Sequence, residues 1–474
     1  MPDAAPGRAD LIERLVSLCK QRGFVFPSSE IYGGINAVYD YGPLGVRLRR
    51  NIRRRWWRAM VDLRDDVEGI ETAVLMNPEV WVASGHVQSF SDPLVDCTGK
   101  CRKRWREDHL ADERRARGRP PDAPGCPECG GALTPARQFN LMFKTFVGPV
   151  EEDAAQVWLR PETAQGMFVN FANVVNSTRR RIPFGIAQIG KGFRNEISPG
   201  NFIFRLREFE LMEMEWFCKP GSDREWHEYW CAERMRWHVE DLGVRAANLR
   251  LRAHEKDELS HYSTATSDIE YRFPFGWGEL EGIADRTDFD LDTHMKHSGR
   301  DLSYFDTATN ERYVPYVVEP ALGLDRVMIT LLVDGYDEED VRGETRVVLR
   351  LHPDVAPVQV AILPLSKKAE LCEPARAIEH GLRSRFATEY DETQSIGRRY
   401  RRQDEIGTPL AVTFDFESLN DHAVTIRERD GMSQVRVGVD SLAEALGDQL
   451  TASRSRAAQR VSGANPVDQL RGGD

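Results

Sequence analysis

Residues 193–213, FRNEISPGNFIFRLREFELME, constrain the fold of this chain more than any other segment. The run Ser198-Pro199-Gly200-Asn201 is typical of a turn, so the segment predicts two strands joined as a hairpin. Alternation along the return strand would turn one apolar set of side chains to one face: Phe202, Phe204 and Leu206. The other face would then combine cations with an aromatic ring: Arg205, Arg207 and Phe209.

That second face has the chemistry needed to bind a nucleoside triphosphate. A guanidinium can bind phosphate oxygens through two hydrogen bonds, and an aromatic ring can stack on a purine. The carboxylate of Glu196 could accept a hydrogen bond from an exocyclic amine. One hairpin could therefore hold the whole nucleotide, and the alternative is an ordinary charged hairpin without a ligand.

The same residues resemble the second signature motif of class II aminoacyl-tRNA synthetases, which reads Arg-x-Glu, a loop, and then Arg-x-x-x-Phe. The matching positions are Arg194, Glu196, Arg205 and Phe209. Residues 319–327, EPALGLDRV, are similar to the third motif of that class, in which a glycine-rich strand runs into a helix. The resemblance implies that the arginine of this motif, Arg326, binds the γ-phosphate of ATP.

Longer matches narrow the resemblance to glycyl-tRNA synthetases. Residues 159–166, LRPETAQG, look like a signature of that family, and residues 275–284, FGWGELEGIA, resemble its next landmark. Residues 23–45 and 139–145 match as well, so the resemblance extends over nearly all of 10–450. It implies ATP-dependent attachment of glycine to tRNA(Gly) through a glycyl-adenylate.

The implied fold is α+β, with an antiparallel catalytic sheet flanked by helices over residues 1–354 and an insert at 97–137. Residues 355–450 resemble the α/β anticodon-binding domain that glycyl, histidyl, threonyl and prolyl enzymes share. There, residues 358–365 predict a buried strand, residues 366–386 a helix and residues 410–416 another strand. Residues 451–474 are small, polar and unpatterned, and we expect them to be disordered.

The composition excludes some classes of function. A chain of 474 residues can form two or three domains, and its net charge of −11 argues against a general polyanion binder while leaving local RNA recognition open. The first ten residues lack the apolar core of a signal peptide, and no run reaches about 18 apolar residues. The expectation is a cytoplasmic enzyme without a membrane span.

Residues 44–63 predict an amphipathic helix, because apolar side chains recur every fourth residue between arginines. The arginines indicate either a solvated helix face or an RNA-binding one. An apolar run at 72–76 and Asn77-Pro78 follow, which predicts a strand and its end. Helix, strand and proline in this order resemble the first class II motif, which builds the dimer interface in that family, so the resemblance implies a homodimer.

Four cysteines in the insert are spaced like metal ligands. Cys97 and Cys101 form one pair, and Cys126 and Cys129 form a second pair in a Cys-Pro-x-Cys-Gly turn. Four thiolates would satisfy one tetrahedral zinc ion, and the alternative is a set of free thiols on a loop. Residues 98–137 carry ten Lys/Arg against six Asp/Glu, which suits either contact with an acceptor stem or a solvated insert.

Two other patterns do not predict sites. Residues 185–191 have the spacing of a phosphate-binding loop, but Gly192 replaces the hydroxyl residue that should hold magnesium, and a strand continues where a helix is needed. His294 and His297 lack the spacing of metal ligands, and we expect them on the polar face of a helix.

By resemblance, Arg194 should meet the α-phosphate, Arg205 and Arg326 the β/γ end, Phe209 the adenine face and Glu196 the adenine amine. Glu279 is the expected magnesium ligand, since a carboxylate beside phosphates suits a hard cation. Arg194, Glu196 and Arg326 are the expected catalytic residues. The full set of expected ATP-binding residues is Arg194, Asn195, Glu196, Phe204, Arg205, Leu206, Arg207, Glu208, Phe209, Glu279, Leu280, Gly323, Leu324, Asp325 and Arg326.

A glycine pocket must bind the ammonium with carboxylates and exclude larger amino acids by bulk, without editing. The candidates for the ammonium are Glu162, Glu213 and Glu319, and Arg106 is expected to meet the carboxylate. The full set of expected glycine-binding residues is Arg106, Glu162, Phe209, Glu210, Leu211, Met212, Glu213, Glu319, Pro320, Ala321, Leu322 and Gly323. The chain departs from the family at Ala321, where a serine is usual, and this puts full glycine affinity in doubt.

Residues 397–402, GRRYRR, could bind RNA phosphates while Tyr400 stacks on a base, and the alternative is a solvated turn. Two rival functions follow from the same resemblance. One is a repurposed synthetase paralogue that binds RNA or protein without aminoacylation, and the other is a class II enzyme for another small amino acid. The motif residues argue against the first rival, because an inactive relative would be free to lose them.

Overall fold

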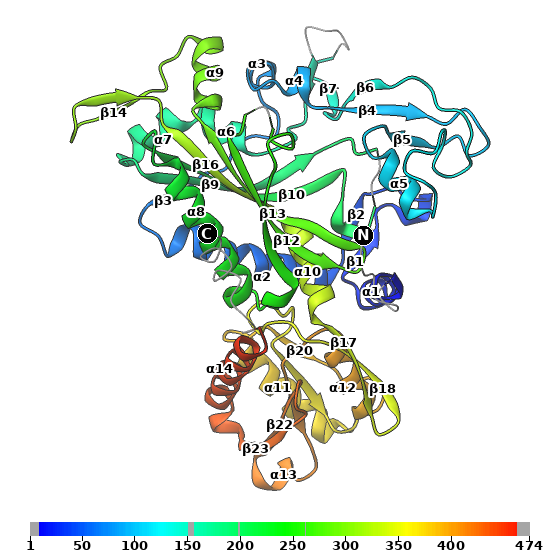
Figure 1. Cartoon of the computed structure of the whole chain (residues 1–474). Helices are drawn as coiled ribbons and strands as arrows, with labels where there is room; N and C mark the ends of the chain where they lie inside the picture. The colour runs from blue at the N-terminus through cyan, green and yellow to red at the C-terminus, as the bar shows by residue number, and fades with distance from the viewer. Residues whose placement is uncertain (1–8, 150–155, 198–199, 261, 462–474) are drawn as a thin grey trace.

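The computed structural model describes residues 9–149, 156–197, 200–260 and 262–461 (Figure 1). A large body holds the amino-terminal three quarters of the chain, and a smaller domain below it holds the remainder. Among the described residues, no helix combines the length and the apolar character needed to cross a membrane.

The large body is built on a seven-stranded sheet with the order β11-β12-β13-β16-β10-β9-β3. Neighbouring strands are antiparallel except β3, which pairs parallel to β9 at the edge. The sheet confirms the predicted α+β class with an antiparallel core. In sheet order the strands are Leu249–Ala253, Ala265–Phe273, Gly276–Thr287, Tyr316–Gly323, Glu208–Cys218, Phe184–Phe193 and Val67–Gly69.

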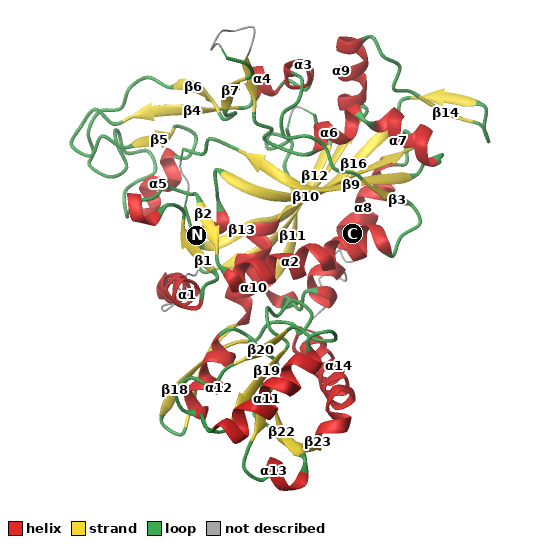
Figure 2. Cartoon of the chain, turned by 180° about the vertical axis from the view of Figure 1, so that it is seen from behind, coloured by secondary structure: helices red, strands yellow, loops and turns green. Residues whose placement is uncertain are grey.

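Helices cover both faces of this sheet. One face packs against α1 (Ala9–Arg22), α2 (Pro43–Trp57), α8 (Asp223–Arg236) and α10 (Leu324–Gly335), and this contact forms the largest apolar core. The other face carries α6 (Ala164–Val169), α7 (Phe171–Thr178) and α9 (Phe289–Ser298) over part of its area. Figure 2 shows α2 and α10 below the sheet, while α6, α7 and α9 lie above it.

Strand β10 shows how alternation separates the two faces. Met212, Met214 and Trp216 are buried in the core with α2 and α8, whereas Phe217 packs into the cluster with α6 and α7. Glu213 and Glu215 have the same parity as Phe217, so they also point away from the main core.

The predicted helix at 44–63 is confirmed as α2, which continues as one π-helical segment over Arg58–Asp62. Its arginines divide into two groups. The first group forms ion pairs with acidic side chains of other elements: Arg49, Arg53 and Arg55. The second group lies on the exposed face of the helix: Arg47, Arg50, Arg54 and Arg58.

Two predictions for this body were wrong in their details. The strand after α2 is Val67–Gly69 and not the apolar run at 72–76, where Leu75 forms only an isolated bridge with Leu159. The strands of the 193–213 hairpin end at Phe193 and begin again at Glu208, and residues Phe202–Phe204 form a turn of 3-10 helix. The alternation predicted for 202–207 therefore does not exist, and Ser198 and Pro199 lie outside the described residues.

Smaller elements surround the sheet. The insert at 97–137 contains β5 (Arg104–Arg106) and α5 (Leu110–Ala116), and β5 forms one sheet with β4 (Ser91–Asp96) and β6 (Arg137–Asn140) at the two ends of the insert. Helices α3 (Pro78–Ala83) and α4 (His86–Ser89) precede it, and β7 (Lys144–Phe146) pairs with β8 (Gln156–Trp158) after it. Two further hairpins are β1 (Val25–Pro27) with β2 (Tyr39–Tyr41), and β14 (Tyr304–Asp306) with β15 (Glu311–Tyr313).

After α10, a hairpin of β17 (Tyr336–Val341) and β18 (Glu344–Leu349) leads to the smaller domain. Its sheet has the order β20-β19-β21-β22-β23, with β19 parallel to both of its neighbours. These strands are Thr388–Tyr390, Val360–Pro364, Leu410–Phe414, Ala423–Glu428 and Gln434–Gly438. The α/β prediction and the strands predicted near 358 and 410 are confirmed.

Helices α11 (Ala369–Leu382) and α14 (Leu442–Val461) pack on one face of this smaller sheet, and α12 (Ile396–Glu405) packs on the other. The short α13 (Ser418–Asp421) joins β21 to β22. The prediction of disorder from 451 was wrong as far as Val461, because α14 continues to that residue. Residues 462–474 lie outside the described residues.

Candidate active site

A cavity of about 280 Å³ opens on the sheet face that the main core does not use. Strands β10, β13 and β16 form its floor, and the connection between β9 and β10 forms one wall. The predicted site residues that line it are Glu162, Arg194, Glu196, Phe204, Arg205, Leu206, Phe209, Leu211, Glu213, Glu279, Glu319, Ala321, Leu322, Gly323, Asp325 and Arg326.

Other predicted residues lie outside this lining, mostly because they occupy alternate strand positions. Met212, Leu280 and Leu324 are buried in the main core. Glu208 and Glu210 are on the opposite face of β10, where Glu208 pairs with Lys191 and Glu210 pairs with Arg49 and Arg53. Pro320 is the buried residue between two lining positions of β16.

Three further predicted residues have other partners and do not line the cavity. Arg106 on β5 pairs with Asp92 at 3.1 Å and with Asp108 at 2.6 Å. Arg207 donates hydrogen bonds to the carbonyl oxygens of Asn36 at 2.9 Å and Glu196 at 3.1 Å. The backbone amide of Asn195 donates to the carbonyl of Leu141 at 2.7 Å.

One end of the cavity is cationic. Arg326, in the first turn of α10, lies 2.9 Å from the carboxylate of Glu279 and 4.8 Å above the ring of Phe204. The Arg194 guanidinium lies 5.4 Å from the centroid of the Phe209 ring and donates to the carbonyl of Pro161. The guanidinium of Arg326, and less strongly those of Arg194 and Arg205, lower the pKa of Glu279. This end therefore offers fixed positive charge beside an ionised carboxylate.

A β-bulge turns Glu279 into the cavity. Ile269 pairs with Glu281 and Glu270 pairs with Glu279, so Leu280 has no partner across the strand pair. Glu279 and Glu281 consequently face opposite ways although they are two residues apart. Glu281 is buried on the other side of the sheet, where it accepts from Arg234 at 2.6 Å and contacts His238 at 2.7 Å.

The other end of the cavity holds three carboxyl groups, Glu162, Glu213 and Glu319. Burial above all, and the nearby Glu213 and Glu162, raise the pKa of Glu319 to about 8 against the opposing effect of Arg286. Burial and then Glu162 raise the pKa of Glu213 as well. Burial opposes the charged form of Glu162, but His86, Arg286 and Gln165 together outweigh this effect and lower its pKa. The cluster repels additional negative charge and attracts a small cation.

Buried partners hold these carboxyl groups in place. Arg286 contacts Glu319 and donates two hydrogen bonds to Asp290, at 2.7 and 2.9 Å. Asp290 accepts from Gln165 at 2.8 Å, and Gln165 also donates to Glu162 at 3.0 Å. His86 approaches Glu162 at 3.2 Å from α4.

Arg286, His86, Gln165 and Asp290 are not among the site residues predicted from the sequence. The spacing of Arg286 and Asp290, which lie four residues apart where β13 ends and α9 begins, was the available signal. His294 was predicted on a polar helix face, and this was wrong. It is buried in α9 and shares a hydrogen bond of 2.8 Å with Gln165, whereas His297 is exposed.

Ala321 lies at the centre of the cavity floor. It pairs with Glu213 on one side and with Gly282 on the other, and all three residues face the cavity. The residues that flank it in the sheet thus provide one carboxylate and one position without a side chain. A substrate that approaches this part of the floor meets little bulk there.

The four cysteines of the insert converge, as their spacing predicts. All four sulfur atoms lie within 4.8 Å of one another. The Cys97–Cys129 sulfur distance is 3.5 Å, and Cys101 lies 3.4 Å from Cys126 and 3.6 Å from Cys129. A tetrahedral zinc with bonds of about 2.3 Å needs sulfur atoms about 3.8 Å apart, so the cluster fits such an ion with small adjustments.

The basic segment at 397–402 is part of α12 and is mostly engaged within the domain. Arg399 is buried and donates to backbone carbonyls, including that of Gln394 at 3.2 Å. Tyr400 packs on Leu363 and shares a hydrogen bond with Thr413, and Arg402 donates to Asp391 at 3.0 Å. The hypothesis that Tyr400 stacks on a base was therefore wrong, because the ring already lies against the sheet.

The segment 185–191 forms part of strand β9, which confirms that it is no phosphate-binding loop. A phosphate-binding loop requires a helix after its glycines, and here the strand extends to Phe193.

Comparisons with known proteins agree with this geometry. A family model described as the tRNA synthetase class II core domain (G, H, P, S and T) matches residues 145–334. A second model, described as an anticodon binding domain, matches residues 359–449. A solved prolyl-tRNA synthetase from Cryptosporidium parvum, in complex with L-proline and AMP, has a TM-score of 0.64. It is 14% identical and covers 94% of this chain and 76% of its own, which shows the shared fold.

Relatives with curated names are much more similar. The glycine--tRNA ligase of Caldanaerobacter subterraneus subsp. tengcongensis is 57% identical over 93% of this chain and 98% of its own length. That of Thermobifida fusca is 55% identical over 94% of this chain and 99% of its own. The two family models, the shared fold and these relatives lead to one assignment, and the chain belongs to the glycine--tRNA ligase family of class II aminoacyl-tRNA synthetases.

Proposed function

We infer that this chain attaches glycine to tRNA(Gly) in two steps that consume ATP. The glycine carboxylate attacks the α-phosphorus of ATP, and the bond to pyrophosphate breaks as the glycyl-adenylate forms. A ribose hydroxyl at the end of the tRNA then attacks the activated carbonyl and releases AMP. The observation that best supports this function is a single cavity with a cationic end and an acidic end, in a chain 57% identical to a glycine--tRNA ligase.

Neither step needs a protein nucleophile, so the residues act by position and charge. We propose that Arg194 binds the α-phosphate, that Arg205 and Arg326 bind the β/γ end, and that Phe209 stacks on adenine while Glu196 accepts from its amine. Glu279 would hold magnesium, which supplies positive charge to the phosphates when bound. The proximity of Asp268, whose pKa is raised by burial and by Glu279, supports a cation at this end.

The acidic end would select glycine. The ammonium group of glycine would bring positive charge to Glu162, Glu213 and Glu319. Arg286 is the fixed cation that contacts Glu319. Arg106 points to Asp92 and Asp108, so a role with the glycine carboxylate would require it to leave those partners. Ala321 supplies no hydroxyl where the family usually has one, and the alternative function without aminoacylation finds no other support in the site.

The arginines provide the first test of this function. Arg194→Ala or Arg326→Ala should lower glycine-dependent ATP–pyrophosphate exchange by at least about 10²-fold, because each removes a preorganised charge from the transition state. Arg224→Ala, an exposed residue of α8, is the matched control and should exchange normally. Exchange that both variants leave intact, or that alanine drives better than glycine, would refute the assignment.

We propose that the four cysteines bind one structural zinc ion, as their convergence supports. The ion would cross-link two short turns of an insert whose own apolar cluster is small.

Elemental analysis should therefore find about one zinc per chain, and Cys126→Ser together with Cys129→Ser should abolish it, because two thiolates cannot complete a tetrahedral site. Replacing two cysteines outside the insert, Cys19 and Cys372, should leave the zinc content unchanged. Metal-free wild-type protein with full activity would show that the thiols are simply free.

We also propose that the chain works as a homodimer in the cytoplasm. Two features support a dimer interface at the first motif. Strand β3 is an edge of the main sheet, and an apolar groove beside it is lined by residues that include Ile70, Leu75 and Val174.

Sedimentation equilibrium should find two chains per particle, and Leu75→Asp should shift the protein to monomers by placing a charge in that groove. A monomeric wild-type protein at micromolar concentration would contradict the proposal.

A further inference from the structure

The hairpin of β17 and β18, which we call the arm, connects the helix of Arg326 to the smaller domain. Helix α10 begins beside the cavity at Leu324 and ends at Gly335, and β17 follows directly. Strand β18 then packs against α12 of the smaller domain, and Figure 1 shows the arm beside that helix. A continuous segment therefore runs from the cationic end of the cavity to the anticodon-binding domain.

Arg346 on β18 is buried where the arm meets the domain. Its side chain has no exposed area, and Nε donates to the Asp404 carboxylate on α12 at 2.8 Å. Nη2 donates to the carbonyl oxygen of Arg429, and Nη1 contacts Glu339 on β17. Asp404 is equally buried and also accepts from Arg427 at 2.9 and 3.1 Å.

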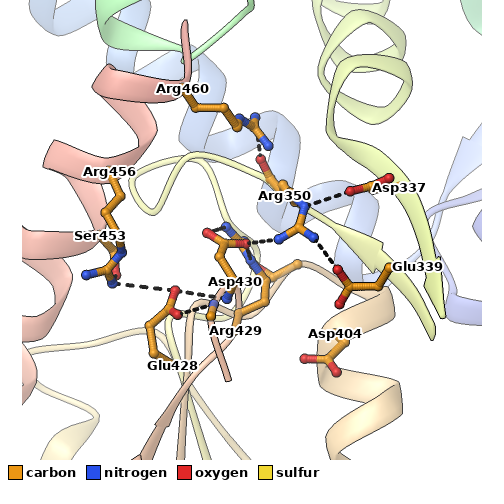
Figure 3. Close-up of polar contacts among 12 residues, drawn as sticks. Asp337, Glu339, Arg350, Asp404, Glu428, Arg429, Asp430, Ser453, Arg456 and Arg460 are labelled. Carbon is orange, nitrogen blue, oxygen red and sulfur yellow. Dashed lines mark hydrogen bonds and ion pairs between the residues drawn. The ribbon is translucent and has the colours of Figure 1, made fainter. Parts of the chain in front are cut away.

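Arg350, just after the arm, binds three carboxylates (Figure 3). It donates to Asp337 at 3.0 Å and to Glu339 at 2.9 Å, both on the arm, and to Asp430 of the smaller domain at 3.0 Å. Its backbone carbonyl accepts from Arg460 of α14 at 3.0 Å. Burial opposes the charge of Asp430, but Arg429 and Arg350 outweigh this effect and lower its pKa, so this carboxylate stays ionised.

Arg429 and Glu428 of the smaller domain provide a second set of contacts next to the arm. Arg429 donates to the carbonyl oxygen of Leu351 at 3.0 Å and to that of Gly407 at 2.9 Å, while it pairs with Asp430. Glu428 accepts from the backbone amides of Asp430 and Gly431 and faces Arg456 at 3.4 Å (Figure 3). The β22–β23 turn, α12 and α14 therefore together hold the arm and the residues that directly follow it.

These contacts constrain the orientation of the smaller domain relative to the arm more strongly than an apolar interface would. Domains in one chain move relative to each other unless their interface prevents it. Apolar surfaces tolerate sliding, whereas a guanidinium needs its acceptors in fixed directions. A buried charge that loses a partner is costly, and other orientations of the domain would leave Arg346 with Glu339 alone and Asp404 with Arg427 alone.

We propose that Arg346 and Arg350 are positioning residues that lock the anticodon-binding domain onto the arm, so that a tRNA held by its anticodon presents its acceptor end to the cavity. The inference rests on the proposed function. It adds that the contacts between the arm and the smaller domain affect the transfer of glycine to tRNA. They do not affect adenylate formation, because neither arginine lines the cavity.

Arg350→Gln tests this in the full-length enzyme, because it removes three carboxylate contacts and keeps the carbonyl that Arg460 uses. The kcat/KM for charging tRNA(Gly) should fall about tenfold, the range expected for loss of a coupled polar network. Glycine-dependent pyrophosphate exchange should stay at the wild-type rate, as should charging of a hairpin RNA that has only the acceptor stem. Arg236→Gln removes the surface ion pairs of Arg236 with Glu233 and Glu240 and should change none of the three.

Asp430→Asn approaches the same contact from the other domain and serves if Arg350→Gln does not fold. The two changes together should lower kcat/KM for tRNA charging by less than the product of their separate effects, because they share the contact between Arg350 and Asp430. Equal charging of tRNA(Gly) by variant and wild type would overturn the proposal, and so would equal losses with tRNA and hairpin RNA. A wild-type enzyme that charges no RNA would instead refute the proposed function.

Discussion

The pairing register of four central strands, β9, β10, β16 and β13, is the constraint on which the rest of the molecule depends. Side chains alternate along a strand, so the register decides which residues enter the apolar core and which face the cavity. Met212 and Trp216 fill the core while Glu213 faces the cavity from the same strand. A slip by one residue would bury the carboxylates among apolar helices and expose the methionines.

The apolar core under the sheet makes the charged cavity above it possible. Buried charges are costly unless they are paired, and the paired groups here come from several elements. Arg286 on β13, Asp290 on α9 and Gln165 on α6 hold the carboxyl groups of Glu319 and Glu162. Burial, and then the neighbouring Glu213 and Glu162, keep the pKa of Glu319 raised although Arg286 contacts its carboxyl group. A cation that enters the cavity would relieve that imbalance, which is the physical basis for binding an ammonium group.

The sequence predicted the fold class and most of the cavity because long motifs carry both. It did not predict which residues of a strand face the cavity, because a motif is a continuous run of residues whereas one face of a strand is formed by alternate residues. Glu210 and Met212 were expected beside glycine for that reason, and they point away from it. Leu280 and Arg286 lie at irregularities of β13, which periodicity cannot locate.

Contacts between segments far apart in the chain could also not be predicted from the sequence. His86 meets Glu162 through tertiary packing, and no local pattern marks it as a partner. Tyr400 and Arg399 looked free for RNA, but their hydrogen bonds to Thr413 and to the carbonyl of Pro364 hold α12 against its own sheet. The arginines of α2 divide between ion pairs and exposed positions according to partners such as Asp325 and Asp354, which lie hundreds of residues away.

The most direct test of the account compares two glutamates in the main sheet. Glu319 faces the cavity from β16, whereas Glu208 lies on the opposite face of β10 and pairs with Lys191. Glu319→Gln should raise the KM for glycine in pyrophosphate exchange by at least about tenfold, as expected for loss of a charged partner worth about 1.5 to 3 kcal/mol. Glu208→Gln should leave that KM unchanged. Equal effects of the two substitutions, or no effect of Glu319→Gln, would contradict the claim that strand register selects the residues that bind glycine.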